Sequence, residues 1–225
     1  MKNTDSSFKE QFRQFCLENG IKEECLFSKK NSRTFAETAI DGYTDYPVFL
    51  YSCGGKYKAK TLTDMFSIDF KSRVNTTLGI ASDHFESVLL IEPPSTRKVG
   101  FLDYAKAVNL KNFYLLFIKT SLRQQAFENF ALKVRKKYMG ERTIYAYVFS
   151  TKMEFQRQGY GKRLFGLLMD FAKKNDYEIC LETNKESNIA LYESFGFQLV
   201  ESLVYKKQLG HYVMFFSPKA KASKQ

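Results

Sequence analysis

The stretch from Ile144 to Phe171 constrains the fold of this chain more than any other. Its first part, YAYVFS, is rich in the β-branched and aromatic residues that favour a strand. A turn with the pattern Q-x-x-G-x-G follows, from Gln156 to Gly161. The last part carries apolar residues at i, i+3, i+4 and i+7, the spacing of one buried helix face: Leu164, Leu167, Leu168 and Phe171. The stretch therefore predicts a strand, a glycine-bearing turn and an amphipathic helix.

The glycine turn predicts an anion site. A helix that begins just after such a turn points its free N–H groups and the positive end of its dipole at the turn. Phosphate is the anion that suits this arrangement, and glycines let it approach the backbone closely. The competing interpretation is a plain tight turn that allows close packing of the helix on the strand, and the turn alone does not choose between them.

The charge of the chain favours anionic partners. Its 225 residues carry a net charge of +11, which suits a phosphorylated cofactor, nucleic acid or an acidic surface. The lysines are scattered, and no RNA- or DNA-binding motif is present. A solvated basic surface is therefore favoured over nucleic-acid binding.

The cysteine and histidine content argues against a metal site. The four cysteines lie far apart, no C-x-x-C pair occurs, and the chain has two histidines. Scattered cysteines are typical of reduced thiols in a cytoplasmic protein. The first residues, MKNTDSSFKEQF, lack the apolar core of a signal peptide, and no apolar run has the length of a membrane span. We expect a cytoplasmic protein without a metal and without a membrane segment.

The order of the predicted elements indicates one α/β domain. Helices are expected over residues 7–18, 32–42, 62–70, 101–117, 121–138, 162–174 and 188–194, and a turn at 45–47. Strands are expected over residues 77–81, 87–91, 143–151, 177–182, 197–203 and 210–216. We divide the chain into an N-terminal helical extension (1–30), the main domain (31–217) and a basic disordered tail (218–225). The aromatic residues of the first helix could pack on its own core or on a partner, which leaves a homodimer open.

A second motif, LETNKESNIALYESFGF, follows the strand over 177–182. With the Q-x-x-G-x-G turn it resembles the GNAT superfamily of acetyl-CoA-dependent N-acetyltransferases, over residues 143–215. Within that superfamily it looks most like the branch that includes puromycin N-acetyltransferase. The residues that carry this likeness are Leu181, Glu182, Thr183, Asn188, Tyr192, Glu193, Gly196 and Phe197.

The resemblance implies a splayed mixed β-sheet flanked by helices, an α/β fold that some schemes class as α+β. The strands at Ile144 and Tyr177 would run parallel and part at one end, and acetyl-CoA would enter the V between them. Backbone groups would pair with the pantetheine arm at Phe149, Ser150 and Thr151. Backbone N–H groups would hold the pyrophosphate at Arg157, Gln158, Gly159, Tyr160, Gly161 and Lys162. Asn188 either caps the helix that carries Tyr192 or contacts CoA.

The chain departs from the family in two places. Thr151 and Met153 stand where the family usually has Val and Pro, at the local bulge of the strand. The N-terminus begins with a helix-like segment where the family usually begins with a strand. The pantetheine pairing is made by backbone groups, so the first change is tolerable.

The implied chemistry is transfer of the acetyl group of acetyl-CoA to a primary amine, by direct attack in a ternary complex. Tyr192 holds the family position for the donor of a proton to the leaving thiolate; otherwise it is a core aromatic residue. Glu182 would accept the amine proton or bind the ammonium, or else make a structural hydrogen bond. Glu92 is a second candidate base, and His211 is interpreted as a surface or packed histidine.

The branch resemblance favours a small-molecule amine as the acceptor. Two alternatives stay open: a protein or peptide N-acetyltransferase, and a non-catalytic acyl-CoA-binding module that keeps the fold. A basic nucleic-acid binder is a third class. It predicts steeply salt-dependent binding.

Overall fold

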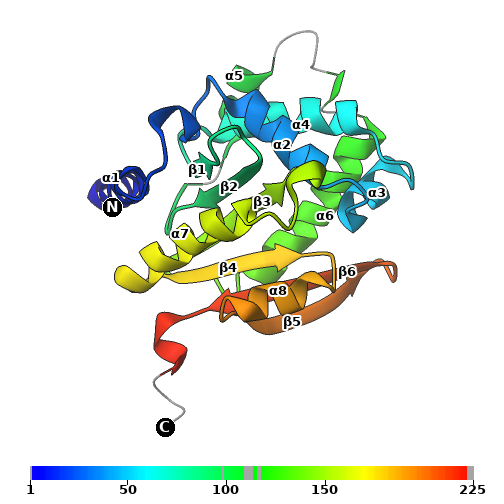
Figure 1. Ribbon diagram of the computed structural model, residues 1–225. Coiled ribbons are helices and arrows are strands. Elements are labelled where there is room, and N and C mark those ends of the chain that lie inside the picture. Colours follow the sequence, from blue (N-terminus) through cyan, green and yellow to red (C-terminus); the bar gives the residue numbers. More distant parts are fainter. Residues whose placement is uncertain (1, 98, 109–113, 116–117, 222–225) are drawn as a thin grey trace.

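The computed structural model describes residues 2–97, 99–108, 114–115 and 118–221. It has a six-stranded mixed sheet in the order β1-β2-β3-β4-β6-β5, with helices on both faces (Figure 1). The strands are β1 (Leu78–Ala81), β2 (Ser87–Glu92), β3 (Thr143–Thr151), β4 (Glu178–Thr183), β5 (Gln198–Tyr205) and β6 (Leu209–Phe216). Strands β3 and β4 are parallel, and the other neighbouring pairs are antiparallel. The predicted mixed α/β fold is confirmed.

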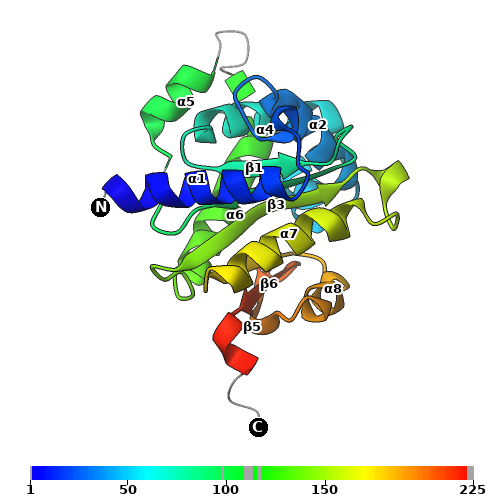
Figure 2. The same cartoon turned by 60° about the vertical axis from the view of Figure 1, so that its left-hand side comes forward.

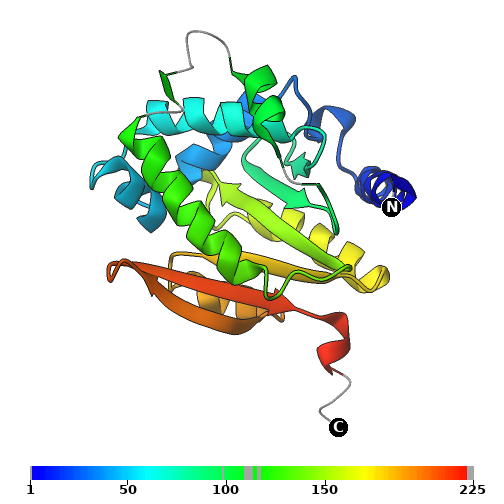
Figure 3. The ribbon, with the colours of Figure 1, turned by 180° about the vertical axis from the view of Figure 1, so that it is seen from behind.

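Helices α7 and α6 lie on opposite faces of the sheet. Helix α7 runs along one face (Figure 2), and α6 crosses β3 and β4 on the other, which is seen from behind in Figure 3. The helices are α1 (Lys2–Glu18), α2 (Ser32–Gly42), α3 (Pro47–Cys53), α4 (Ala59–Arg73), α5 (Phe101–Ala107), α6 (Lys119–Arg135), α7 (Tyr160–Lys174) and α8 (Asn188–Ser194). Short 3-10 turns are η1 (Glu23–Cys25), η3 (Met153–Phe155) and η4 (Pro218–Lys221).

A β-bulge at Tyr147 opens the sheet. The pairing of β2 with β3 shifts register between Leu90 and Ile91, which lie opposite Val148 and Ala146, so Tyr147 is the extra residue. The parallel pairing of β3 with β4 ends at the same place, since its last pair is Ala146 with Leu181. Bulges bend a strand and increase its twist. The two strands therefore part beyond the bulge, and the predicted V is confirmed.

Two predicted elements need correction. Residues 47–53 form α3, where we expected only a turn; Pro47 stands at the first helical position, where its missing N–H costs nothing. The helix expected over 101–117 ends at Ala107, because Val108 adopts an extended backbone with ψ of 131°. The rest of that predicted helix includes residues 109–113 and 116–117, which lie outside the described residues.

Helix α1 packs on α7 of the same chain. Phe8 and Phe12 are buried, and their rings contact Phe171 edge-on with centroids 5.5 and 5.1 Å apart. The boundary that we placed after residue 30, and the homodimer, stay predictions. Of the predicted tail, residues 218–221 form η4, and residues 222–225 lie outside the described part of the chain.

Candidate active site

A small cavity of about 40 Å³ lies where β3 and β4 part. Its volume is close to that of one water molecule, about 30 Å³. It brings together predicted residues of β3, β4 and α8, and it adds two tyrosines from the link between α2 and α3. The lining residues are Tyr43, Tyr46, Ala146, Tyr147, Phe149, Phe165, Leu181, Glu182, Asn188 and Tyr192.

Tyr192 presents a hydroxyl without a partner in this cavity. Its ring is buried on α8, beside Phe165 and Phe197 with centroids 5.7 and 6.0 Å away. The hydroxyl makes no hydrogen bond to any residue in the described part of the chain. Burial, with smaller contributions from Tyr46 and Tyr43, raises the pKa of Tyr192 well above its ordinary value. The phenol therefore keeps its proton at neutral pH and is available as a donor.

Two tyrosines from the α2–α3 link bind the parted strands. The Tyr43 hydroxyl donates to the carbonyl of Phe149 (3.1 Å) and accepts from the N–H of Phe149 (3.3 Å). The Tyr46 hydroxyl is 2.8 Å from Thr183 Oγ1 and accepts from the N–H of Asn184 (3.0 Å). Each tyrosine thus satisfies polar groups that one strand no longer shares with the other. Sequence reasoning missed both, because their partners lie more than 100 residues away.

We expect Tyr43→Phe to lower the free energy of unfolding by about 1–3 kcal/mol, because it leaves a backbone N–H and a carbonyl without a partner. Urea denaturation of the protein without ligand measures this. Tyr177→Phe is the matched control, since the Tyr177 hydroxyl has no hydrogen bond within the described residues. An equal loss in both variants would contradict the role assigned to the Tyr43 hydroxyl.

Glu182 is buried at the other wall of the cavity. Its side chain is 9% exposed, and Oε2 accepts from Arg135 Nη1 (2.8 Å) and from the Tyr145 hydroxyl (2.7 Å). His211 Nε2 lies 3.3 Å from Oε1, an ion-pair distance without hydrogen-bond geometry. Burial alone would raise the pKa of Glu182, but the His211 contact, the Arg135 charge and the Tyr145 hydroxyl together lower it. The carboxylate is therefore ionised at neutral pH.

A second buried polar cluster anchors the bulge. The Tyr147 hydroxyl donates to Asp69 (2.6 Å), and Arg73 bonds both Asp69 (2.9 Å) and Glu92 (2.7 Å). These contacts tie β3 to α4 at the point where the V begins. Glu92, the second candidate base, is held in this cluster and does not line the cavity.

The two glycines at the start of α7 serve different purposes: one fits the predicted anion site, and the other fits the close packing of the helix on the strand. Gly159 has φ of +92°, and a Cβ there would meet nothing within 4 Å, so the space beside it is open. A Cβ at Gly161 would lie 2.8 Å from Thr151 Oγ1 and 3.0 Å from the Phe149 ring. Gly159 therefore leaves room for a ligand, and Gly161 lets the helix pack on β3. No described residue accepts from the backbone N–H groups of Gly159, Tyr160, Gly161 and Lys162.

The other predicted binding residues are placed as follows. Asn188 is the first residue of α8 and donates to Thr183 Oγ1 (3.2 Å); the N-cap is Ser187, so the capping interpretation of Asn188 is wrong. The Ser150 hydroxyl donates to the carbonyl of Ala39 (3.0 Å), away from the V. In an antiparallel pair of strands, residues whose backbone N–H and C=O groups bond to the partner strand alternate with residues whose groups point away from it. Phe149 and Thr151 are of the second kind relative to β2, so their backbone groups point toward the V.

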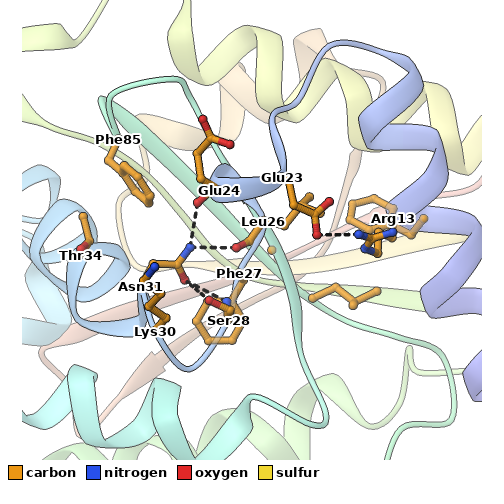
Figure 4. A pocket seen from close by; sticks show the side chains of 13 residues that line it. Arg13, Glu23, Glu24, Leu26, Phe27, Ser28, Lys30, Asn31, Thr34 and Phe85 are labelled. Atoms are coloured by element: carbon orange, nitrogen blue, oxygen red, sulfur yellow. Dashed lines mark hydrogen bonds and ion pairs between the residues drawn. The ribbon is translucent and has the colours of Figure 1, made fainter.

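Other kinds of site find less support. All four cysteines are free and buried, and burial raises the pKa of Cys16 and Cys180 to about 12. Among the residues described here, no three His, Cys, Asp or Glu side chains are grouped to hold a metal, and no helix could span a membrane. A larger cavity of about 690 Å³ lies beside β1 (Figure 4), and it shares no lining residue with the cavity between β3 and β4. Its charged pair, Arg13 with Glu23, is exposed.

Comparison with known proteins gives one family match over part of the chain and several similar folds. Residues 130–199 match the family model described as acetyltransferase (GNAT) domain. No curated protein matches the chain. The C-terminal condensation domain of Ebony, solved with beta-alanyl-dopamine, has 8% identity over 85% of this chain and 96% of that one, with a TM-score of 0.59.

Two N-acetyltransferase structures are similar in fold. The Drosophila melanogaster polyamine N-acetyltransferase has 8% identity, 84% and 96% coverage of the two chains and a TM-score of 0.54. Mosquito arylalkylamine N-acetyltransferase like 5b has 14% identity, 85% and 98% coverage and a TM-score of 0.51. The fold is therefore that of the GNAT acetyltransferases, and residues 130–199 match the acetyltransferase domain of that family.

Proposed function

We propose that this protein transfers the acetyl group of acetyl-CoA to a primary amine of a small molecule, by direct attack in a ternary complex. The observation that carries the proposal is the unpartnered hydroxyl of Tyr192 in a cavity where β3 and β4 part. The same end of β3 leads into α7, whose first N–H groups lack acceptors among the described residues. The proposed proton donor and the proposed anion site thus lie toward the same, C-terminal end of β3.

The residues present suit acetyl-CoA, which supplies an activated thioester acyl group. The N–H groups from Gly159 to Lys162 would hold the pyrophosphate, and Arg157, Gln158 and Tyr160 flank them. The pantetheine arm would lie along Phe149, Ser150 and Thr151, with Asn188 nearby. The backbone N–H and C=O of Phe149 are hydrogen-bonded to the Tyr43 hydroxyl. These two hydrogen bonds would have to break for the pantetheine arm to pair with Phe149.

Three groups of the chain support the chemistry. Glu182 would take the amine proton, directly or through the water that the cavity can hold. A backbone N–H near Thr151 would stabilise the negative oxygen that develops on the acyl carbon. Tyr192 would donate a hydrogen bond to the leaving thiolate. The raised pKa of Tyr192 suits a hydrogen-bond donor better than a group that gives its proton away fully.

A small amine is the acceptor class that we favour. Structures of similar fold include a polyamine N-acetyltransferase and an arylalkylamine N-acetyltransferase-like protein, and the likeness to the puromycin branch adds aminonucleosides. The four free thiols support a cytoplasmic location. The alternatives are a peptide N-acetyltransferase and a non-catalytic acyl-CoA-binding module.

Acetyl-CoA is expected to raise the melting temperature by roughly 5–10 °C at a concentration a hundred times its Kd. Binding to the folded state alone adds about 2.7 kcal/mol at that ratio, and a chain of this size shifts about 2–4 °C per kcal/mol. Differential scanning fluorimetry measures the shift, with adenosine as the control ligand. No shift at millimolar acetyl-CoA would contradict the proposal.

A thiol-release assay with an amine panel tests the reaction itself. The panel holds polyamines, arylalkylamines, aminonucleosides and short peptides. Release that depends on a small amine supports the proposed function, and release with peptides alone supports the peptide alternative. Acetyl-CoA binding without release for any amine would identify a binding module.

A further inference from the structure

His211 is buried beside Glu182, and the two side chains face each other with polar atoms that have no hydrogen-bond partner. The imidazole lies on β6 at 1% exposure, between the rings of Phe127 and Phe130 on α6, with centroids 5.5 and 5.4 Å away. Neither ring nitrogen makes a hydrogen bond within the described residues, and neither does Glu182 Oε1. Nε2 and Oε1 are 3.3 Å apart. A proton between these two atoms would satisfy both at once.

The buried charged groups beside His211 are net negative. Arg135 forms ion pairs with Glu182 (2.8 Å) and with Glu128, so two carboxylates share one guanidinium. This group carries a charge of −1, and protonation of His211 brings it to zero. The other titratable groups facing His211 are Tyr145 of β3, Tyr205 of β5, and Glu201 of β5, which is paired with Lys137.

Glu182 by itself is a poor store for a proton. Its environment favours the ionised form, so a proton taken up by this carboxylate leaves it readily. An imidazole ordinarily binds a proton about two pH units more readily than a carboxylate does. His211 does not line the cavity, and its Nε2 lies 3.3 Å from Glu182 Oε1, so a small movement brings the two atoms to hydrogen-bond distance.

We infer that His211 completes the base of the reaction: it holds the amine proton, which reaches it through Glu182. An N–H bond of the attacking amine breaks as an O–H bond forms on Glu182. That O–H bond then breaks as an N–H bond forms at Nε2 of the neutral imidazole, and the proton returns to solvent after the product leaves. His211 is a positioning residue that acts through Glu182. This inference rests on the proposed function.

His211→Gln tests it, with His84→Gln as the matched control. His84, the other histidine of the chain, is exposed at the turn between β1 and β2. We expect His211→Gln to lower kcat about tenfold at pH 7, a part of what general base catalysis contributes. The KM for the amine and for acetyl-CoA should stay within threefold. The acid limb of the kcat/KM profile should move at least one pH unit lower, because only the carboxylate is left. His84→Gln should match the wild type.

A second measurement needs no activity. In His84→Gln the remaining histidine gives a single set of ring proton NMR signals, and its titration midpoint is followed with and without Glu182→Gln. Loss of the carboxylate should move the midpoint to lower pH, because a neighbouring negative charge favours the imidazolium. This arm stays informative if His211→Gln fails to fold.

The outcomes separate the inference from the proposed function. If His211→Gln keeps the rate and the acid limb of the control while the wild type acetylates amines, His211 has no part in the base and the proposed function stands. If no amine supports thiol release, the proposed function fails. An unchanged NMR midpoint without the Glu182 carboxylate overturns the proton-sharing pair in either case.

Discussion

Tyr192→Phe is expected to lower kcat at least about a hundredfold and to leave the fold almost as stable as before. Removing one hydrogen-bond donor to an atom that develops negative charge in the transition state typically lowers kcat by about 10²–10³-fold. The Tyr192 hydroxyl has no partner within the described residues, so its removal breaks no internal hydrogen bond and should cost less than about 1 kcal/mol of unfolding free energy. Thiol release and urea denaturation measure the two quantities on the same samples.

The combination of these two results distinguishes a catalytic hydroxyl from a structural one. Tyr177→Phe again serves as the control and should change neither quantity. The rise in melting temperature caused by acetyl-CoA should persist in Tyr192→Phe. An unchanged kcat would remove Tyr192 from the mechanism and leave the leaving thiolate without an assigned donor.

Arg135→Met is expected to lower the free energy of unfolding by about 3–5 kcal/mol at pH 7. The change leaves Glu182 as an uncompensated buried charge, which is the costly way to break a buried ion pair. It also removes the guanidinium from the face of Tyr145, 4.3 Å from the ring centroid. Urea denaturation measures the loss. The double variant Arg135→Met, Glu182→Gln should regain most of the lost free energy of unfolding, because it no longer has the buried carboxylate charge.

The pH dependence of this loss has a defined sign. In the wild type the folded-state pKa of Glu182 is lowered, so its stabilisation is present above the unfolded pKa of about 4.3 and is lost as pH falls further. Without Arg135 the effect of burial is offset less, so the folded-state pKa rises and protonation stabilises the variant. The gap between variant and wild type should therefore narrow as pH falls from 7 toward 5.

An exposed ion pair gives the control for this experiment. Arg13→Met breaks the pair with Glu23, whose side chains are 42% and 63% exposed, and should change the free energy of unfolding far less than Arg135→Met does. A loss in Arg135→Met that is equally small, or that does not change with pH, would show that Glu182 does not carry a buried charge.

Local sequence patterns predicted the helices whose own residues show which face is buried or where the helix begins and ends. Helix α8 was predicted at its observed bounds because a polar loop precedes it and a glycine follows it. Helix α7 shows its buried face in the spacing from Leu164 to Phe171. Helix α3 was missed because its seven residues, PVFLYSC, are too few to show a period, and their aromatic and β-branched members equally suit a strand.

The residues of the candidate site are likewise of two kinds, those that belong to a local motif and those that do not. The glycine turn and the tyrosine of α8 belong to contiguous motifs, so sequence could name them. Tyr43, Arg135 and His211 belong to no motif, and their contacts to Phe149 and Glu182 span 106, 47 and 29 positions. No local sequence pattern around these three residues predicts those contacts.

By itself the sequence determined the strand–turn–helix unit, the second motif and the positions of the strands along the chain, because propensity and periodicity act over neighbouring residues. The tertiary structure alone decided where the sheet opens, which tyrosines satisfy the parted strands, and that Glu182 shares a buried cluster with Arg135 and His211. The physical reason is that burial decides how strongly charged groups interact and whether a hydroxyl or carboxylate has a hydrogen-bond partner. Burial is a property of the packed chain and not of any single segment.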